Sequence, residues 1–253
     1  MGKILAIANQ KGGVAKTTTA VNIAALLADE GKQVLLADMD PQGNATSGLG
    51  IEKTSGMRCI YDLLINDYPF DRICCGTPVE GLSILPATIQ LSGAEVELVS
   101  MVNREKLLKN ALASIRELFD YVIIDCPPTL GLLTINALTA ADGVLIPVQC
   151  EYYALEGLGQ LITTIELVKK HLNTNLEIFG TLLTMRDPRT NLSNQVADEV
   201  RNYFKEKTFE QSIYRNIRLS EAPSYGLPIH LYDPRSKGAE QYRLVVLEVL
   251  NRG

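Results

Sequence analysis

The chain has 253 residues, of which 46% are apolar and 21% charged, and its formal net charge is −5. This composition is ordinary for a folded protein and excludes a wholly disordered or collagen-like chain. A protein that coats nucleic acid by bulk charge is basic, so the acidic balance disfavours that class.

Apolar runs of strand length alternate with longer amphipathic stretches along the whole chain. The runs predict strands at residues 4–8, 33–38, 82–86, 121–125, 143–148 and 178–185. The stretches predict helices at residues 16–30, 104–118, 130–140, 154–171, 191–204 and 237–250. Continuous apolar strands are typical of sheets covered on both faces. The pattern therefore predicts an α/β fold with a doubly wound, mostly parallel β-sheet and helices on both faces. Because no linker is visible, we expect one domain over residues 1–253.

A glycine-rich loop joins the first predicted strand to the first predicted helix. It reads Gln-Lys-Gly-Gly-Val-Ala-Lys-Thr-Thr at residues 10–18. Successive backbone N–H groups in such a loop, together with the helix N-terminus, bind phosphate. Lys16 can bridge the β- and γ-phosphates of a nucleotide, and the Thr17 hydroxyl can bind Mg²⁺. The loop departs from the ordinary Gly-x4-Gly-Lys-Ser/Thr pattern, but it fits the variant Lys-Gly-Gly-x-x-Lys-Thr, which adds Lys11.

Three aspartates stand at or just past the ends of predicted strands. Asp38 and Asp40 follow the second strand, and Asp125 ends the strand at residues 121–125. In an open parallel sheet, ligands bind outside the carboxyl ends of the strands. We therefore expect the three carboxylates to converge on the phosphate loop, where an aspartate can hold Mg²⁺ directly or through water.

Together these motifs resemble the ParA/Soj family of chromosome-partitioning ATPases, within the wider MinD/ParA superfamily. The similarity extends beyond the phosphate loop to residues 38–44, 125–134, 147–157, 189–192 and 218–226. It covers essentially the whole chain, and it implies a P-loop ATPase of the variant Walker A type that binds ATP or ADP with Mg²⁺.

The resemblance also assigns roles to single residues. It implies that ATP is sandwiched in a homodimer, in which Lys11 reaches the phosphates of the second protomer. It makes Lys11, Lys16 and Asp40 the catalytic residues, with Asp40 positioning the attacking water. It places Mg²⁺ beside Thr17, Asp38 and Asp125. The implied nucleotide-binding residues are Lys11, Gly12, Gly13, Val14, Ala15, Lys16, Thr17, Thr18 and Asn216.

The partners are likewise implied by the resemblance. In this family the ATP-bound dimer binds double-stranded DNA without sequence preference, and Arg189 and Arg218 match DNA-binding positions. Both arginines lie in residues 186–253, which carry 11 Lys and Arg against 9 Asp and Glu, unlike the acidic remainder. A ParB/Spo0J-type protein stimulates hydrolysis and releases the DNA. Soj-like proteins also act on the replication initiator DnaA.

Two positions depart from the family pattern. Ala15 stands where relatives usually carry Gly, and a left-handed backbone there would cost about 1 kcal/mol or more. Tyr214 replaces a Pro in the segment that lies near the adenine in relatives, where we expect Asn216 to contact the nucleotide.

Features outside these motifs bear on the location of the protein and on other functional classes. Five cysteines without a Cys-x-x-Cys pair fit a reduced cytoplasm. The family resemblance further implies association with the nucleoid in the ATP-bound state. A MinD-like membrane-associated positioning ATPase is the main alternative, but it needs a basic amphipathic C-terminal tail. Residues 239–252 hold two Arg against two Glu, which favours a helix packed on the core and no membrane partner.

Two further functional classes have less support from the residues. For an iron–sulfur carrier, Cys126 is the only suggestive cluster ligand. A DNA-binding module without turnover would not need Asp40.

Overall fold

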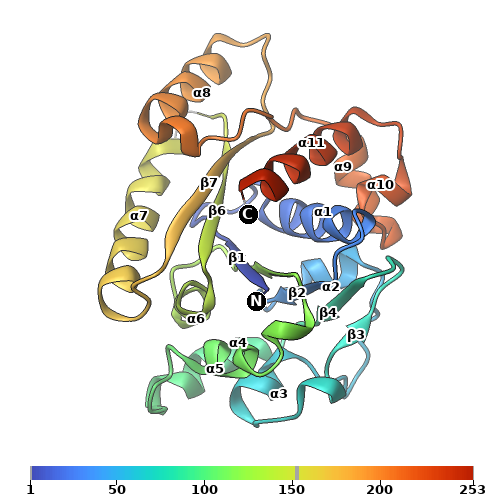
Figure 1. The fold of residues 1–253 in the computed structure, drawn as a ribbon, viewed down its shortest axis with the longest axis vertical. Helices are drawn as coiled ribbons and strands as arrows, with labels where there is room; N and C mark the ends of the chain where they lie inside the picture. The colour runs from blue at the N-terminus through green and yellow to red at the C-terminus, as the bar shows by residue number, and fades with distance from the viewer. Residues whose placement is uncertain (1, 152–153, 253) are drawn as a thin grey trace.

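The structure is a computed structural model that describes residues 2–151 and 154–252. Its strands form a seven-stranded sheet in the order β3–β4–β2–β5–β1–β6–β7 (Figure 1). Neighbouring strands are parallel except β3, which runs antiparallel to β4 at one edge. The strands are β1 Lys3–Ile7, β2 Val34–Asp38, β3 Cys75–Gly76, β4 Leu82–Leu85, β5 Tyr121–Asp125, β6 Gly143–Gln149 and β7 Glu177–Thr184.

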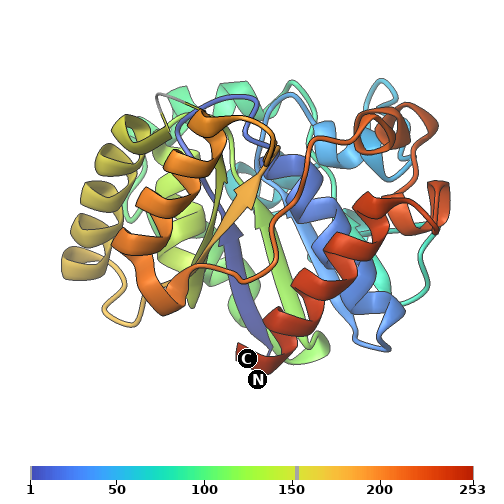
Figure 2. The ribbon, with the colours of Figure 1, turned by 90° about the horizontal axis from the view of Figure 1, so that it is seen from above.

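Helices cover both faces of the sheet (Figure 2). On one face lie α1 Lys16–Asp29, α2 Asn44–Gly48, α9 Ile217–Glu221, α10 Ile229–Tyr232 and α11 Lys237–Arg252. On the other lie α3 Ile60–Ile65, α4 Leu91–Glu97, α5 Leu107–Ala113, α6 Leu132–Ala140, α7 Ala154–His171 and α8 Asn191–Phe204. The predicted doubly wound, mostly parallel α/β fold is therefore confirmed.

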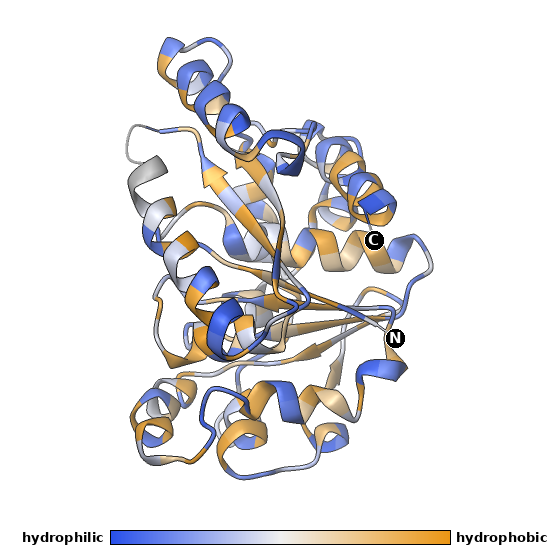
Figure 3. Ribbon diagram, turned by 60° about the vertical axis from the view of Figure 1, so that its left-hand side comes forward, coloured by the Kyte–Doolittle hydropathy of each residue, from blue (hydrophilic) through white to orange (hydrophobic). Residues whose placement is uncertain are grey.

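The sheet separates two hydrophobic cores. Successive side chains of a strand point to opposite faces, so Ile4 and Ala6 of β1 enter one core while Leu5 and Ile7 enter the other. Figure 3 shows the consequence, because the strands are apolar along their length while the helices carry both apolar and polar residues. This double burial explains why the strands read as uninterrupted apolar runs.

One predicted helix is wrong in its length. The stretch 104–118 was expected as a single helix, but α5 spans only Leu107–Ala113, and a 3₁₀ turn follows at Arg116–Leu118. The buried Asn136 amide of α6 accounts for the late start. The Asn136 oxygen accepts a hydrogen bond from the Leu108 N–H at 3.2 Å, and the Asn136 nitrogen donates one to the Arg104 carbonyl at 2.7 Å. These two backbone groups bond to a side chain of the next helix, so the turn before Leu107 is held by tertiary contacts.

The C-terminal helix packs on the helix that follows the phosphate loop. The Tyr242 hydroxyl of α11 lies 3.1 Å from the Thr19 hydroxyl of α1, and both side chains are fully buried. Figure 2 shows α11 lying beside α1. The expected packing of residues 237–250 on the core is confirmed. In the part of the chain that the structure describes, every helix is too short or too polar to cross a bilayer.

Candidate active site

The register of the central strands brings the phosphate loop and two aspartates to one edge of the sheet. Asp125 pairs with Ile7 of β1 on one side and with Asp38 of β2 on the other. The Met39 N–H then donates to the Asp125 carbonyl at 2.9 Å, which fixes the chain leaving β2. Asp38, Asp40 and Asp125 are all at least nine-tenths buried there. The predicted convergence at the strand ends is what the structure shows.

The phosphate loop presents backbone donors to open space. Among the described residues, the backbone N–H groups of residues 12–18 have no hydrogen-bond acceptor. The next N–H along the chain, that of Thr19, donates to the Ala15 carbonyl. A side chain added at Gly12 or Gly13 would meet nothing within 4 Å, and Gly13 has φ +75°. A row of unpaired N–H groups facing a hollow at a helix N-terminus is a phosphate-binding cradle.

Side-chain hydrogen bonds tie the loop and the residue before it to the neighbouring strands β6 and β7. The buried Asn9 amide donates to the Pro147 carbonyl of β6 at 2.7 Å, and the Asn9 oxygen accepts the Lys11 N–H. The Thr184 hydroxyl at the end of β7 donates to the carbonyl of the buried Val14 at 3.1 Å. The cradle is therefore held in shape before any ligand arrives.

Ala15 adopts the left-handed conformation, with φ 67° and ψ 32°, at the position just before α1. A residue with a Cβ pays a steric penalty of about 1–2 kcal/mol in this region. The strain anticipated for an alanine at this position is thus present in the loop.

The two lysines of the loop point in different directions. Lys16 is nine-tenths buried and its ammonium donates to the Lys11 carbonyl at 3.0 Å, inside its own loop. Burial lowers the pKa of Lys16, and the nearby charges of Asp125 and Asp40 oppose that shift. The Lys11 ammonium instead lies 3.7 Å from Glu151, which also faces Arg215. The Lys16 ammonium is therefore bound within the phosphate loop, whereas the Lys11 ammonium lies beside a carboxylate outside it.

Asp38 organises the loop that carries Asp40. One of its oxygens accepts the backbone N–H and the hydroxyl of Thr46, at 2.8 and 2.7 Å, and the other accepts the Asp40 N–H at 3.2 Å. Burial raises the pKa of Asp38 to about 6, although the Thr46 and Asp40 bonds oppose the rise. Because both oxygens are engaged, Asp38 fits a metal site best through an intervening water.

Asp125 is the fully buried carboxylate that lacks partners. Neither of its oxygens accepts a hydrogen bond that meets ordinary geometry from the described residues. Burial raises the pKa of Asp125 well above its usual range, and the adjacent Asp38 raises it further, while the Thr17 hydroxyl and Lys16 lower it. An orphaned buried carboxylate beside a hydroxyl and a phosphate cradle fits Mg²⁺, which prefers oxygen ligands.

The protein alone supplies few ligands to such an ion. Among the described residues, no group of three or more His, Cys, Asp or Glu side chains is arranged to hold a metal. A site built from Asp125 and Thr17 would therefore be completed by water and phosphate oxygens, which is the usual arrangement for Mg²⁺ at a nucleotide. Cys126 beside it is almost fully buried, as expected of a small apolar residue.

A cavity of about 290 Å³ opens beside the phosphate loop. Thr18 lines it together with Met185, Tyr214, Asn216 and Pro223. The Asn216 oxygen accepts the Arg218 N–H at 2.9 Å and so caps α9. The Tyr214 N–H donates to Gln241 at 3.1 Å, a bond that a proline at this position could not make. Asn216 and the phosphate-loop residues Ala15 and Thr18 thus line the same cavity.

The two arginines expected to bind DNA lie outside this cavity. Arg189 precedes α8, and its side chain is 86% exposed. Arg218 lies in α9 and is about half exposed. Each is paired with acidic neighbours, which the sequence analysis did not anticipate.

Comparisons with known proteins fit this geometry. The profile of a family described as "AAA domain" matches residues 2–178. The chain is 62% identical to the sporulation initiation inhibitor protein Soj of Bacillus subtilis, over the full length of both. It is 56% identical to the chromosome partitioning protein ParA of Myxococcus xanthus, covering all of this chain and 89% of that one. The chain belongs to the ParA/Soj family of chromosome-partitioning ATPases.

A solved structure agrees with the ParA/Soj fold. A Mycobacterium smegmatis protein described as cobyrinic acid a,c-diamide synthase superposes with a TM-score of 0.87 at 40% identity, covering 99% of this chain and 95% of that one. That structure holds ADP and magnesium. The family predicted from the sequence, and with it the ATPase class, is confirmed.

Several residues of this ParA/Soj site were not identified from the sequence. Thr46 holds Asp38, Thr184 holds the loop, and Glu151 faces Lys11. No local sequence motif marks Thr46 or Thr184 as part of a site. Glu151 stands two residues past the end of β6, near the same carboxyl edge of the sheet that Asp125 ends, and this position could have marked it.

Replacing Ala15 with Gly should stabilise the nucleotide-free protein. The substitution removes the steric penalty of the left-handed conformation, so we expect the free energy of unfolding to rise by about 1 kcal/mol and Tm by about 2–4 °C. Ala20→Gly, inside α1, should shift Tm downward instead. A lower Tm for Ala15→Gly, measured by thermal unfolding, would contradict the strain.

Asp125→Asn should stabilise the protein when magnesium and nucleotide are absent. Burial raises the pKa of Asp125 well above its ordinary value, so the stability that this group contributes is full below the ordinary value and is lost as pH rises through the raised value in the folded protein. Near pH 7.5, with a chelator, the variant should therefore unfold at a higher temperature than the parent. Asp71→Asn, on the surface, serves as the control. An equal or lower Tm for Asp125→Asn would show that its charge is compensated.

Proposed function

We propose that residues 1–253 act as one ATPase domain that dimerises on ATP, binds DNA in that state, and releases it after hydrolysis. The observation that carries this proposal is that the two loop lysines make different contacts. Lys16 completes its own cradle, and Lys11 is held away from it beside Glu151. A second lysine that does not serve its own phosphates is available for those of another protomer.

The surface around Gly12 supports a dimer. Packing within its own protomer does not require a glycine at this position, since a Cβ there would meet nothing within 4 Å. A glycine facing open space at the mouth of a phosphate site suits the close approach of another surface. With ATP bound on both sides, Lys11 would place a cation where charge builds during loss of the γ-phosphoryl group.

The hydrolytic roles follow from the positions of the side chains. ATP or ADP with Mg²⁺ is the cofactor pair, and Mg²⁺ when bound neutralises charge on the phosphate oxygens. Thr17 and Asp125 would hold it directly, and Asp38 would act through an intervening water. Asp40 accepts the Gln42 N–H on one oxygen, at 2.9 Å. In the described residues no hydrogen bond ends on its other oxygen, which is free to accept one from the attacking water.

The partners belong to the same proposal. Arg189 and Arg218 have exposed guanidinium groups. Both belong to the segment 186–253, in which basic residues outnumber acidic ones. Two copies brought together by ATP would double these contacts with DNA phosphates, which makes DNA binding depend on the dimer. A ParB/Spo0J-type protein would stimulate hydrolysis, DnaA would be a second protein partner, and the ATP-bound form would associate with the nucleoid.

Asp40→Asn should separate ATP binding from hydrolysis. Loss of the acceptor charge is expected to slow turnover by about 10²-fold or more. ATP affinity and ATP-dependent dimerisation should stay close to those of the parent, because Asp40 does not belong to the cradle. Phosphate release and light scattering measure the two properties. Unchanged turnover would remove Asp40 from the water-positioning role.

Binding to random-sequence duplex DNA tests the larger proposal. We expect binding with ATP and Mg²⁺ only, weakened by salt, and not with ADP or without nucleotide. Arg218→Ala should lower the affinity and flatten the salt dependence while leaving dimerisation intact. Arg201→Ala, on α8, is the matched control. Hydrolysis without DNA binding in any state would favour the MinD-like alternative, which liposome binding then tests.

A further inference from the structure

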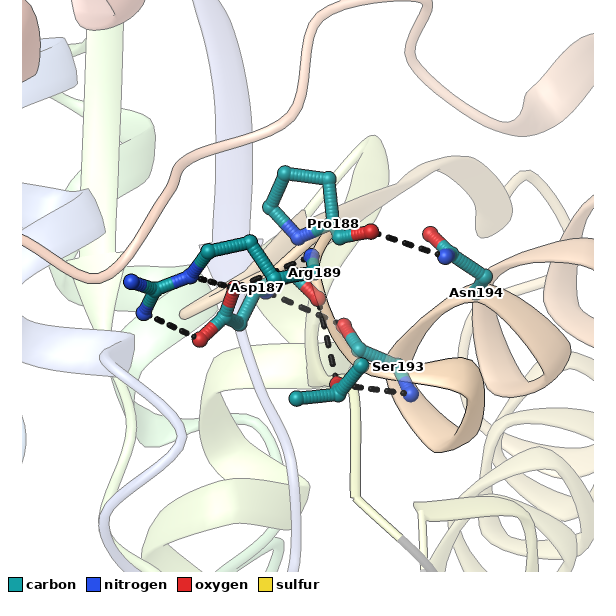
Figure 4. A network of polar contacts seen from close by, with 6 residues as sticks. Asp187, Pro188, Arg189, Ser193 and Asn194 are labelled. Carbon is teal, nitrogen blue, oxygen red and sulfur yellow. Dashed lines mark hydrogen bonds and ion pairs between the residues drawn. The ribbon is translucent and has the colours of Figure 1, made fainter.

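The exposed arginines of the proposed DNA surface fold back onto carboxylates of their own chain. Arg189 binds Asp187 through two parallel bonds, with Nε 2.9 Å from Oδ1 and Nη2 2.7 Å from Oδ2 (Figure 4). Arg218 lies 2.9 Å from Glu221 and 3.5 Å from Asp233. Each predicted DNA contact therefore has a carboxylate on it in the single protomer.

Asp187 is fixed in place by the turn that leads into α8. The Asp187 N–H donates to the Ser193 hydroxyl at 3.1 Å, and its carbonyl accepts the Thr190 hydroxyl at 3.1 Å. Its carboxylate also accepts the Arg189 backbone N–H at 3.1 Å. Figure 4 shows these bonds converging on one turn. The carboxylate is thus held by the backbone and stays in place when the arginine leaves.

This pairing bears directly on phosphate binding. The fork of donors that Arg189 gives to Asp187 has the geometry that binds a phosphate through two bonds. The Arg189–Asp187 pair as a whole has no net charge, so it attracts a polyanion weakly and releases few counterions when it binds. The pair is exposed, so it is worth only a small free energy and a phosphate can replace the carboxylate.

We propose that Asp187 and Glu221 compete with DNA phosphates for Arg189 and Arg218 and thereby limit the DNA affinity of each protomer. The inference rests on the proposed function, because it concerns the same DNA surface. It makes the two acidic residues determinants of affinity that do not themselves contact DNA. It also means that weak binding by one protomer is built into the surface, so that firm binding needs two.

The test compares DNA affinity for Asp187→Asn and the parent, both with ATP and Mg²⁺. Asparagine keeps an oxygen that accepts the Arg189 N–H, so the turn is retained. We expect binding about two- to fivefold tighter at low salt, with a steeper salt dependence. Glu221→Gln should act in the same direction. Asp198→Asn makes the same change of charge on α8, where Asp198 pairs with Arg201, and should have a smaller effect.

A double variant distinguishes competition from a general loss of negative charge. In an Arg189→Ala background, Asp187→Asn should no longer tighten binding, because no arginine is released. If Asp187→Asn matches Asp198→Asn, or weakens binding, the inference is overturned and Asp187 instead orients Arg189. If the parent binds no DNA in any nucleotide state, the proposed function fails and the inference falls with it.

Discussion

Two carboxylates buried side by side at the end of the sheet are the constraint on which the rest of the site depends. The parallel register of β2 and β5 sets Asp38 opposite Asp125, and water is excluded from both. Like charges in such a place destabilise the fold unless a cation or protons compensate them. Two neighbouring groups provide part of this compensation. The buried Lys16 ammonium lies near the charges of Asp125 and Asp40, and Thr46 donates two hydrogen bonds to Asp38. The register of the sheet alone thus creates a buried, acidic environment in which a bound cation would be favourable.

The strain at Ala15 has the same character. The loop must turn sharply between the end of β1 and the start of α1, and the backbone there enters the left-handed region whether or not glycine is present. Anchors on either side, from Asn9 and Thr184, hold the turn against that penalty. Rigidity in a phosphate cradle is useful because the donors need no reorganisation when the ligand arrives.

The sheet edge could be predicted from the sequence because an apolar run that ends in Asp marks both a buried strand and its carboxyl end. The phosphate loop could be predicted because its residues are contiguous. Thr46 could not, since its contact with Asp38 depends on the path of the chain through Gly43, at φ +62°. The helix at 104–118 was predicted too long because periodicity does not register the amide of Asn136. The Asp187–Arg189 pair is local, but whether a guanidinium folds back or extends is decided by rotamer and not by spacing. The dimer, DNA and protein partners remain predictions, because they concern surfaces that one chain does not complete.

The hydroxyl of Thr184 joins two regions that the sequence keeps far apart. It binds the phosphate loop through Val14, and Asp187 follows only three residues later along the same segment. Between them Met185 adopts φ 49°, so the chain leaves β7 by a sharp turn. The nucleotide loop and the arginine-bearing turn therefore share one short mechanical linkage. In the proposed ATPase, a displacement of the loop on phosphate binding would reach the arginine-bearing turn through one hydrogen bond and three residues, so no hinge between domains would be needed.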